Sequence, residues 1–496
     1  MTQTADLSAF GKNDIRGIYG ENVTEELFYY TGRGFVKYVM DKTGRSPKDI
    51  WIAVPRDARL HSEPLAETLI KGIVHSGANA LNLGIAPTPL GYYSEFALFP
   101  EEIEKGAKVS GALIVTASHN PPEYNGLKMT FNKSSLNEAE IQKVKEYTRE
   151  AMLETSGAVQ HGRCVLYSII PQYFDFLSSK FFGLGKGLKI VTDCANGTAG
   201  TIAPKVYKDM GCEVIELFTE PDGHFPNHHP NPSDLSTLET LRAKVIESKA
   251  DLGLAFDGDS DRLGIVDSEG NPVSGDKLLF IYAQDIIKDL APRGENPVIV
   301  SEVKCSQVLY DEINRLGGRA VMAKTGHGYI KSKMKEENAV LAGEMSGHMF
   351  FKDRYYGFDD AVYAGCRIIE IAAERKMKNP QFKISDMLEP FNKVYTSDEV
   401  RYKCPNELKK AVLEEITKIV SNNKDIFKDK ITDIITIDGL RIIFSNGFAL
   451  IRQSNTEPVF TLRFEASDKD RAENFKNIMI SLLDKCMLEK SDGGEK

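Results

Sequence analysis

The chain is predicted to fold as a multidomain α/β protein, and three observations lead to this prediction. Strand-like and helix-like segments alternate over the first two-thirds of the sequence, as in mostly parallel sheets covered by helices. Three short apolar segments each end in a polar loop. The last part of the chain differs, with alternating strands between two helices. The length of 496 residues suggests three or four domains at about 150 residues each.

The first α/β unit begins with an apolar strand over residues 50–54. Apolar residues then recur at helical spacing within 63–77, which predicts a helix, and a second strand follows over 80–83. The same order of strand, helix and strand is predicted twice more, over residues 188–192, 203–210 and 213–217, and over residues 297–303, 307–316 and 320–323.

Three short apolar strands end in polar loops. The strands are 111–115, 252–256 and 339–342, and the loops are 116–120, 257–262 and 343–348. Ligands of α/β proteins bind beyond the carboxyl ends of the strands. We therefore expect three related units, each contributing one loop to a shared site, although a single strand that ends in a polar turn would mean little.

The sequence changes character from about residue 386. A lysine-rich helix is predicted over 407–426 and a terminal helix over 470–487, which together with the strands between them predict an α+β domain. These strands are 434–435, 440–444, 448–453 and 460–465. We place the domain boundaries near residues 165, 274 and 389, so that the predicted domains are 1–165, 166–274, 275–389 and 390–496.

Composition excludes several classes of protein. The net charge of −9 argues against a nucleic-acid binder, which usually has a basic face. The seven cysteines are scattered without a C-x-x-C pair, which favours reduced thiols over disulfides or zinc. No signal peptide or membrane span is recognised, so a cytoplasmic enzyme is expected.

The strongest local signal is the loop DGDSDR at 257–262. The carboxylates of Asp257, Asp259 and Asp261 repel one another unless a cation lies among them, and oxygen-only ligands favour Mg²⁺ or Ca²⁺. An EF-hand would need Gly and Glu where this loop and its continuation have Arg and Ser, so that site is excluded. A solvated acidic turn is the alternative.

The loop TASHNP offers a hydroxyl, Ser118, beside an imidazole, His119. A nucleophilic serine needs a nearby proton acceptor. Asn125-Gly126 predicts a turn that returns Lys128 toward the serine, where it would assist proton transfer or neutralise phosphate charge. Taken alone, the loop is as well explained by a Ser118 that serves as a turn or cap residue.

The loop GEMSGH presents Glu344, which can accept two sugar hydroxyls, and Ser346, which can add a third contact. The stretch RQSNTEP has the composition of a phosphate cradle, with the donor fork of Arg452 followed by hydroxyl, amide and backbone donors. It lacks the glycines and lysine of a Walker loop, which excludes that nucleotide site. An ordinary cap or hairpin loop is the alternative in both cases.

Two basic residues stand apart from these loops. His327 follows the predicted strand 320–323 and can act as a general acid or base. Arg16 is predicted to lie on a turn near the N-terminus. A packed histidine and a surface ion pair are the respective alternatives.

The four motifs TASHNP, DGDSDR, GEMSGH and RQSNTEP, in this order, resemble those of the α-D-phosphohexomutases, and most closely the bacterial phosphomannomutase/phosphoglucomutase branch. The resemblance extends from FGKNDIRGIYG to TLRFEAS. It implies three similar mixed-sheet α/β domains plus a smaller C-terminal α+β domain around a central cleft.

The resemblance also implies a role for individual residues. Ser118 would be the phosphorylated serine and, with Asp257, Asp259 and Asp261, would bind Mg²⁺. The other catalytic residues would be His119, Lys128, Arg262 and His327. The residues implied in substrate binding are Arg16, Lys304, Glu344, Ser346, His348, Arg452, Ser454, Asn455 and Thr456.

The implied reaction interconverts hexose 1-phosphate and hexose 6-phosphate, with mannose, glucose or both as the sugar. Phosphoserine gives its phosphoryl group to the substrate, and the hexose 1,6-bisphosphate turns around and returns its other phosphate. Mg²⁺ and hexose 1,6-bisphosphate are the expected cofactors and a hexose phosphate the expected partner. Nucleic acid and membrane are not expected, and the chain is expected to be a monomer or homodimer.

Two positions depart from the family pattern. Ser260 stands where many members have Gly, and Asn13 where related mutases often have Tyr. We expect the Ser260 side chain to point away from the ion, whereas Asn13 bears on the sugar preference. The alternatives left open are an amino-sugar phosphate mutase, a phosphatase in which water accepts the phosphoryl group, and a non-catalytic sugar-phosphate sensor.

Overall fold

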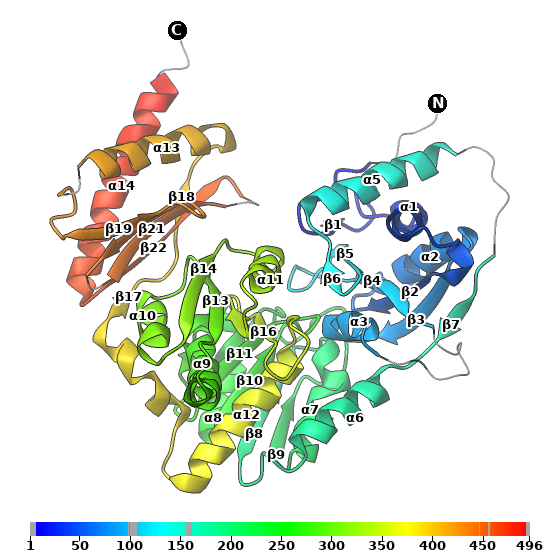
Figure 1. Ribbon diagram of the computed structural model, residues 1–496, viewed down its shortest axis with the longest axis horizontal. Helices are drawn as coiled ribbons and strands as arrows, with labels where there is room; N and C mark the ends of the chain where they lie inside the picture. The colour runs from blue at the N-terminus through cyan, green and yellow to red at the C-terminus, as the bar shows by residue number, and fades with distance from the viewer. Residues whose placement is uncertain are drawn as a thin grey trace. The chain divides into compact units, whose positions relative to one another are not determined.

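The computed structural model describes residues 6–97, 99, 107–154, 161–423, 425–445, 447–454 and 457–492. The chain divides into two compact units. The first unit comprises residues 1–274, 346–351 and 356–384, and the second comprises residues 275–345, 352–355 and 385–496. Figure 1 labels their helices and strands.

The first sheet of the first unit is mixed. Its strands lie in the order β1-β5-β4-β2-β3-β7, and β6 pairs with β5. The apolar strand β2 is parallel to β3 and β4, whereas β5 is antiparallel to β4 and β1. The strands are β1 (Ile15–Ile18), β2 (Trp51–Arg56), β3 (Asn79–Ile85), β4 (Val109–Val115), β5 (Tyr124–Phe131), β6 (Ser134–Ser135) and β7 (Cys164–Leu166).

Three helices, α1 (Glu25–Thr43), α2 (Ser62–His75) and α5 (Glu138–Leu153), pack together on this sheet (Figure 1). Their apolar sides join the inward side chains of β2, β4 and β5 in one core. The Thr24 hydroxyl caps α1, and Gly44 ends it in a left-handed conformation. The short helix α3 (Thr88–Ser94) packs against β2 and β4.

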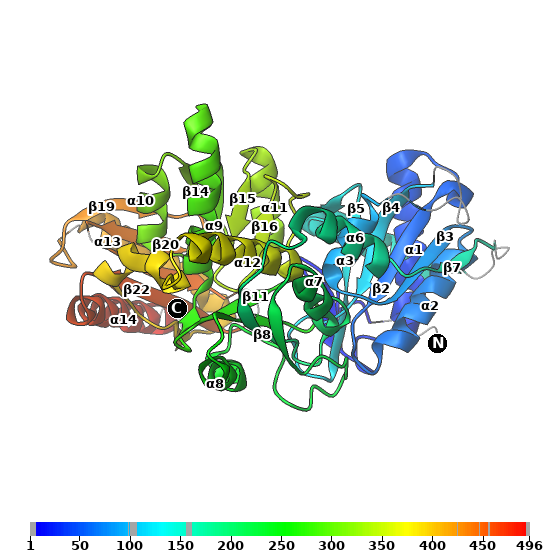
Figure 2. The ribbon, with the colours of Figure 1, turned by 90° about the horizontal axis from the view of Figure 1, so that it is seen from below.

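The second sheet of the first unit has the order β12-β11-β10-β8-β9. Helix α8 (Glu239–Ser248) covers one face, and α7 (Ala203–Asp209) packs on the other, where Tyr207 stacks on Phe256 (Figure 2). Helix α12 (Ala361–Lys378) packs on α7 and β11, and α6 (Ile170–Phe181) on α7. The strands are β8 (Lys189–Asp193), β9 (Glu213–Leu217), β10 (Leu252–Phe256), β11 (Leu263–Asp267) and β12 (Pro272–Val273); β16 (Met349–Phe351) also belongs to this unit.

The second unit contains a parallel arrangement in which β13 lies between β14 and β15. Helices α9, α10 and α11 pack against these strands. The elements are α9 (Gly275–Leu290), β13 (Val298–Glu302), α10 (Gln307–Arg315), β14 (Arg319–Ala323), α11 (His327–Glu336) and β15 (Leu341–Gly343).

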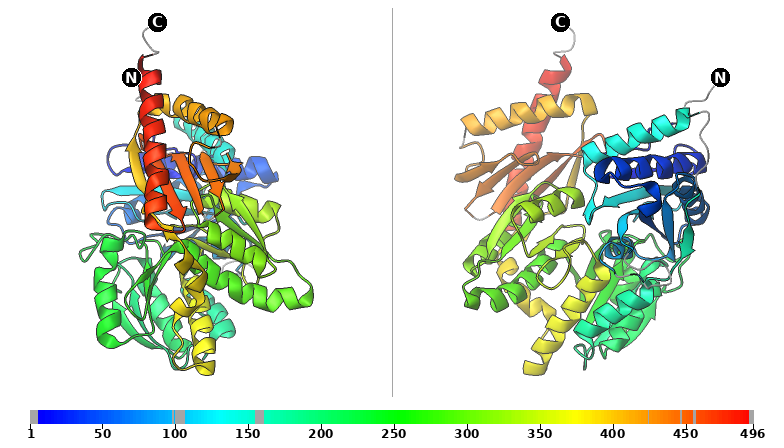
Figure 3. Two further views of the ribbon diagram at one scale, coloured as in Figure 1. Left: turned by 90° about the vertical axis from the view of Figure 1, so that its left-hand side faces the viewer. Right: turned by 45° about the vertical axis from the view of Figure 1, so that its right-hand side comes forward.

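The second unit also contains an antiparallel sheet in the order β17-β22-β21-β20-β19, with β18 paired to β22. Apolar residues of α13 and α14 and of the strands share one core, and Figure 3 shows α14 running along the sheet. The elements are β17 (Tyr395–Thr396), β18 (Val400–Lys403), α13 (Asn406–Asn422), β19 (Ile431–Ile435), β20 (Leu440–Phe444), β21 (Gly447–Gln453), β22 (Val459–Ala466) and α14 (Lys469–Asp492).

These sheets confirm the predicted α/β fold with an α+β region at its end, but two local predictions were wrong. Asn125-Gly126 is not a turn, because both residues lie within β5. Arg16 is not on a turn either, since it lies in β1 and pairs with Gly126. Gly126 is needed there because a Cβ atom would lie 2.1 Å from the Ile15 carbonyl oxygen.

Within the described residues, no helix is both long and apolar enough to cross a membrane. All seven cysteines lie in this part of the chain and are free thiols, and only Cys164 is exposed.

Candidate active site

Ser118 lies in the loop between β4 and β5 and is buried. Its φ of 52° places a non-glycine residue in the left-handed region, which costs on the order of 1 kcal/mol and persists only where neighbours hold it. The Ser118 Oγ donates to Asp257 Oδ2 at 2.9 Å and lies 3.1 Å from His119 Nδ1. The predicted serine, histidine and first aspartate are therefore in direct contact.

Asp257, Asp259 and Asp261 are buried and follow β10. Each has an oxygen within 4.8 Å of an oxygen of the others, which is close enough to hold one metal ion. Asp257 Oδ1 accepts the backbone N–H groups of Asp261 and Arg262. Oδ1 of Asp259 and Oδ1 of Asp261 have no hydrogen-bond partner. Buried carboxylate oxygens without donors are costly unless a cation compensates them.

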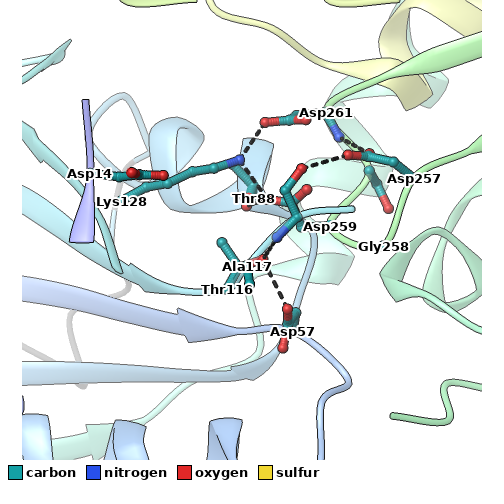
Figure 4. Close-up of polar contacts among 12 residues, drawn as sticks. Asp14, Asp57, Thr88, Thr116, Ala117, Lys128, Asp257, Gly258, Asp259 and Asp261 are labelled. Carbon is teal, nitrogen blue, oxygen red and sulfur yellow. Dashed lines mark hydrogen bonds and ion pairs between the residues drawn. The ribbon is translucent and has the colours of Figure 1, made fainter. Parts of the chain in front are cut away.

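Lys128 extends from β5 to these carboxylates, as Figure 4 shows. Its Nζ donates to Asp259 Oδ2 and Asp261 Oδ2, each at 2.6 Å, and Thr88 Oγ1 also donates to Asp259 Oδ2. Burial alone would lower the pKa of Lys128, but Asp259 and Asp261 outweigh it and raise this pKa. Lys128 is thus held as a cation, which favours charge neutralisation over proton transfer.

The charges around the serine shift the pKa values of its two neighbours. Burial, followed by the charges of Asp261 and Asp259, raises the pKa of Asp257 well above its usual value. Burial, followed by the charges of Arg262 and Arg16, lowers the pKa of His119 well below its usual value. A neutral imidazole and a carboxylate therefore both contact the Ser118 hydroxyl.

Arg262 and His348 contact each other beside Asp257, Asp259 and Asp261, whose loop over residues 257–262 is here called the acidic loop. Arg262 Nε donates to His348 Nε2 at 3.1 Å, and Arg262 Nε lies 3.8 Å from Asp257 Oδ2. His348 Nδ1 lies 3.0 Å from an oxygen of Asp359 and 3.6 Å from one of Asp261. Burial would lower the pKa of His348, but the Asp261 charge and the Asp359 contact raise it.

From β1, Arg16 reaches the loop over residues 116–123 that contains Ser118, here called the serine loop. Its Nη1 donates to Asn120 Oδ1 at 2.7 Å and to the Ala117 carbonyl oxygen at 3.2 Å, while Nη2 pairs with Asp14. The structure therefore brings Arg16, Ser118, His119, Lys128, the three aspartates, Arg262 and His348 together in the first unit.

Sequence analysis missed Asp57 and Arg59, which follow β2. Arg59 is buried and donates to three backbone carbonyls of the serine loop and to that of Tyr124, the first residue of β5. Asp57 accepts from Arg59 and from the hydroxyls of Ser62 and Thr116. The signal was present, because this too is an apolar strand that ends in charged residues.

The remaining predicted residues lie mostly in the second unit. Glu344 is buried and accepts the Gly326 N–H at 2.7 Å, one residue before His327, which begins α11. Lys304 Nζ lies 3.7 Å from Glu302 Oε1, which accepts the Met345 N–H at 2.8 Å. The structure thus brings the elements of Lys304, His327 and Glu344 together around Glu302, another residue that sequence analysis missed.

Arg452 lies at the end of β21, and its Nε donates to Asp438 Oδ2 at 3.1 Å. The same Asp438 oxygen accepts the Thr325 N–H, also at 3.1 Å. The Ser454 carbonyl oxygen accepts from Lys409 Nζ at 3.0 Å. Arg452 is therefore linked through Asp438 to the loop before His327.

Two predicted residues lie where the structure does not describe the chain, and the predicted sugar loop is divided between the units. Asn455 and Thr456 lie outside the described residues. Ser346 and His348 belong to the first unit although Glu344 belongs to the second, so the predicted sugar loop spans the division between the units. The Ser346 carbonyl oxygen accepts from Ser233 Oγ at 3.0 Å.

Ser260, the departure within the acidic loop, is buried and has a φ of 64°. Its hydroxyl lies 2.8 Å from Thr198 Oγ1. The left-handed backbone explains why Gly suits this position, and the Thr198 contact shows what a serine gains there.

Comparison with family profiles matches four consecutive segments of the chain. They are described as phosphoglucomutase/phosphomannomutase alpha/beta/alpha domain I over residues 7–154, domain II over 171–270, domain III over 274–391, and the C-terminal domain over 399–481.

Curated relatives match over nearly the whole chain. A phosphomannomutase/phosphoglucomutase of Pseudomonas aeruginosa is 36% identical over 481 residues, which cover 97% of this chain and 96% of the relative. A phosphoglucomutase of Neisseria gonorrhoeae is 39% identical, with 96% of each chain covered. The crystal structure of a phosphoglucomutase/phosphomannomutase family protein from Burkholderia thailandensis is 33% identical, covers 98% of each chain and superposes with a TM-score of 0.86.

Proposed function

Because the chain belongs to the phosphoglucomutase/phosphomannomutase family, we propose that it interconverts hexose 1-phosphate and hexose 6-phosphate, with glucose, mannose or both as the sugar. Ser118 carries the phosphoryl group, and a hexose 1,6-bisphosphate is the intermediate. The observation that carries this proposal is the 2.9 Å contact between Ser118 Oγ and Asp257, one of three clustered buried aspartates.

The acidic loop fits a divalent cation. Its donor set is oxygen only, which suits Mg²⁺, and two of its buried oxygens have no hydrogen-bond partner. Asp257, Asp259 and Asp261, together with Ser118 or its phosphate, would hold the ion. When bound, Mg²⁺ neutralises the carboxylates and the charge of the phosphoryl group in transfer.

The chain's own residues prepare the serine for transfer. The contacts of Asp257 and His119 with Oγ provide acceptors for the serine proton when the unmodified enzyme is first phosphorylated. Lys128 and Arg16 place positive charge next to the loop, where it stabilises a dianionic phosphate. Arg262 extends this cationic border along the acidic loop, and its Nε donates to His348 Nε2.

The reaction consists of two phosphoryl transfers, and in each of them one P–O bond breaks and another forms. First, the P–O bond to Ser118 Oγ breaks and a P–O bond to the free sugar hydroxyl forms, while the hydroxyl proton passes to a base. Then the other phosphoryl group of the bisphosphate is transferred to Ser118 Oγ, and the sugar oxygen that carried it takes up a proton. We assign His327 as the residue that exchanges this proton with the sugar.

The remaining roles follow from side-chain chemistry. Glu344 and Ser346 accept or exchange hydrogen bonds with sugar hydroxyls. The guanidinium of Arg452 suits a bidentate contact with the phosphate that is not reacting. The other residues assigned to substrate are Lys304, Ser454, Asn455 and Thr456. We also propose that the chain has four domains with boundaries near residues 165, 274 and 389. A cytoplasmic location is part of the same proposal.

The test is turnover of α-glucose 1-phosphate and α-mannose 1-phosphate side by side, with Mg²⁺ and a trace of glucose 1,6-bisphosphate. We expect hexose 6-phosphate from one or both sugars, and none after chelation of Mg²⁺ or in Ser118→Ala. Full turnover by Ser118→Ala would overturn the assignment of the serine. Free phosphate without isomerisation would indicate a phosphatase, and turnover of glucosamine phosphate alone would indicate an amino-sugar mutase.

A further inference from the structure

We propose that Arg59 is a positioning residue for phosphoryl transfer, which holds the serine loop in the shape that presents Ser118 Oγ to the acidic loop. This proposal rests on the proposed role of Ser118 as the phosphoryl carrier. Arg59 does not touch the reacting atoms, and it acts through the backbone of the loop.

Arg59 distributes its donors along the serine loop and the first residue of β5. Nη1 donates to the carbonyl oxygens of Pro121 (2.5 Å) and Tyr124 (3.1 Å), and Nη2 donates to those of Ser118 (3.0 Å) and Asn120 (2.6 Å). Nε donates to Asp57 Oδ2 at 3.1 Å. The planar five-donor fork of arginine suits this arrangement, whereas lysine has three donors on one atom.

The site of Arg59 is closed to solvent. Arg59 is 1% exposed, and Asp57 is 2% exposed. The ring of Phe225 lies over the guanidinium at 5.3 Å. The backbone around Gly223 also lies close to this site, because a Cβ atom on Gly223 would lie 2.5 Å from the Leu60 nitrogen. Hydrogen bonds sheltered from water are stronger, and losing the donor would leave converging carbonyls unsatisfied.

Arg59 and its partner Asp57 constrain Ser118 from both sides. Arg59 holds the carbonyl of Ser118. Asp57 accepts the Thr116 hydroxyl at 2.9 Å, and the same hydroxyl oxygen accepts the Ser118 N–H at 2.8 Å. The strained φ of 52° lies between these two anchored groups. The network therefore accounts for how the loop keeps a backbone conformation that costs energy.

The same carbonyl also sets the distance between the two catalytic loops. A Cβ atom on Gly258 would lie 2.6 Å from the Ser118 carbonyl oxygen. The serine loop therefore rests against the backbone of the acidic loop, and a shift of the Ser118 carbonyl would move Oγ relative to Asp257. A displacement of about 1 Å at a reacting group can reduce the rate about 100-fold.

The experiment measures the rate at which Ser118 is phosphorylated by glucose 1,6-bisphosphate and Mg²⁺, followed by intact mass, in Arg59→Met and Arg59→Lys. The affinity for glucose 6-phosphate is measured by calorimetry on the same proteins. Arg56→Met is the matched control, because Arg56 ends the same strand and pairs at 2.9 Å with the more exposed Glu63. Ser118→Ala is assayed in parallel.

We expect Arg59→Met to be phosphorylated about 100-fold more slowly than the wild type, with Arg59→Lys in between, and glucose 6-phosphate affinity within about threefold. Rates within about threefold of Arg56→Met would overturn the proposal, as would a rate loss matched by an equal loss of affinity. If neither Arg59 variant folds, Asp57→Asn is judged by the same criteria. Phosphorylation of Ser118→Ala would instead overturn the proposed function.

Discussion

Two groups of carboxylates, one in each unit, differ in which hydrogen-bond donors their oxygens have. In the first unit, Asp259 and Asp261 share one lysine, and each keeps an oxygen without a donor. In the second unit, Glu302 accepts from the Met345 N–H and the Thr325 hydroxyl, and Asp438 accepts from the Thr325 N–H and Arg452. The first group is therefore compatible with a metal ion, whereas the second is stabilised by hydrogen bonds.

The difference indicates that a cluster of acidic residues suits a metal ion where its buried oxygens lack hydrogen-bond donors. The second group instead fixes the loops that carry Lys304, His327 and Glu344. The same residue types thus form a candidate metal site in one unit and hold loops together in the other.

The largest effect is expected for Asp257→Asn, which removes one charge from the metal group and keeps its shape. Turnover should fall at least about 100-fold. Mg²⁺ at about 100 times its Kd stabilises the wild type by about 2.7 kcal/mol, and the variant should lose this shift in Tm. Asp193→Asn is the control, since Asp193 ends the neighbouring strand β8 and pairs with His228. An unchanged Mg²⁺ response in Asp257→Asn would contradict the comparison.

Glu302→Gln should lower the stability of the protein without changing its response to Mg²⁺. One side-chain oxygen becomes an amide donor, which would face either the Met345 N–H or the Thr325 hydroxyl. A loss of about 1–3 kcal/mol in unfolding free energy is expected, with the Mg²⁺ response unchanged. Urea unfolding with and without Mg²⁺ measures both, and a variant that alters the Mg²⁺ response would show that the two groups are not distinct.

Glu95 is an intermediate case, a buried carboxylate that accepts from the Thr130 hydroxyl and the Lys133 N–H. Burial raises its pKa from 4.5 to about 7. The folded protein therefore keeps a proton that the unfolded chain has lost, so stability falls as pH rises through this window. In Glu95→Gln this pH dependence should disappear. The unfolding free energy of the variant minus that of the wild type should therefore rise by on the order of 2 kcal/mol from about pH 5 to about pH 8. Urea unfolding at both pH values tests this, and a constant difference would refute it.

The smallest effect is expected for Ser260→Gly, which leaves the carboxylates of the metal group intact. The glycine relieves the left-handed strain but loses the Thr198 contact, so unfolding free energy should change by less than about 1 kcal/mol. Mg²⁺ affinity from calorimetry should stay within about threefold of the wild type. A larger loss of affinity would mean that the Thr198 contact holds the metal loop in place.

Six strands of the first unit were predicted because their apolar runs are bounded by polar loops, namely β2, β3, β4, β8, β9 and β10. β10 has the predicted bounds, and β2 and β4 differ by a few residues at their ends. The chemical character of the acidic loop was also predictable, since three aspartates at alternate positions are rarely compatible with burial without a cation. Lys128 contacts Asp259 and Asp261 of the acidic loop, and it reaches them along a strand rather than through the predicted turn.

What the sequence by itself determined is the alternation of strands and helices, the four motifs and the kind of chemistry that they suit, because these depend on residues close together in the chain. Only the tertiary structure decided that Asn125-Gly126 joins a strand and that Arg59 holds the serine loop. Gly126 pairs with Arg16, and Arg59 donates to the carbonyl of Ser118. The apolar strand that ends before Asp57 and Arg59 marks these residues as candidates, but backbone carbonyls are identical in every residue, so the sequence cannot show which of them Arg59 binds.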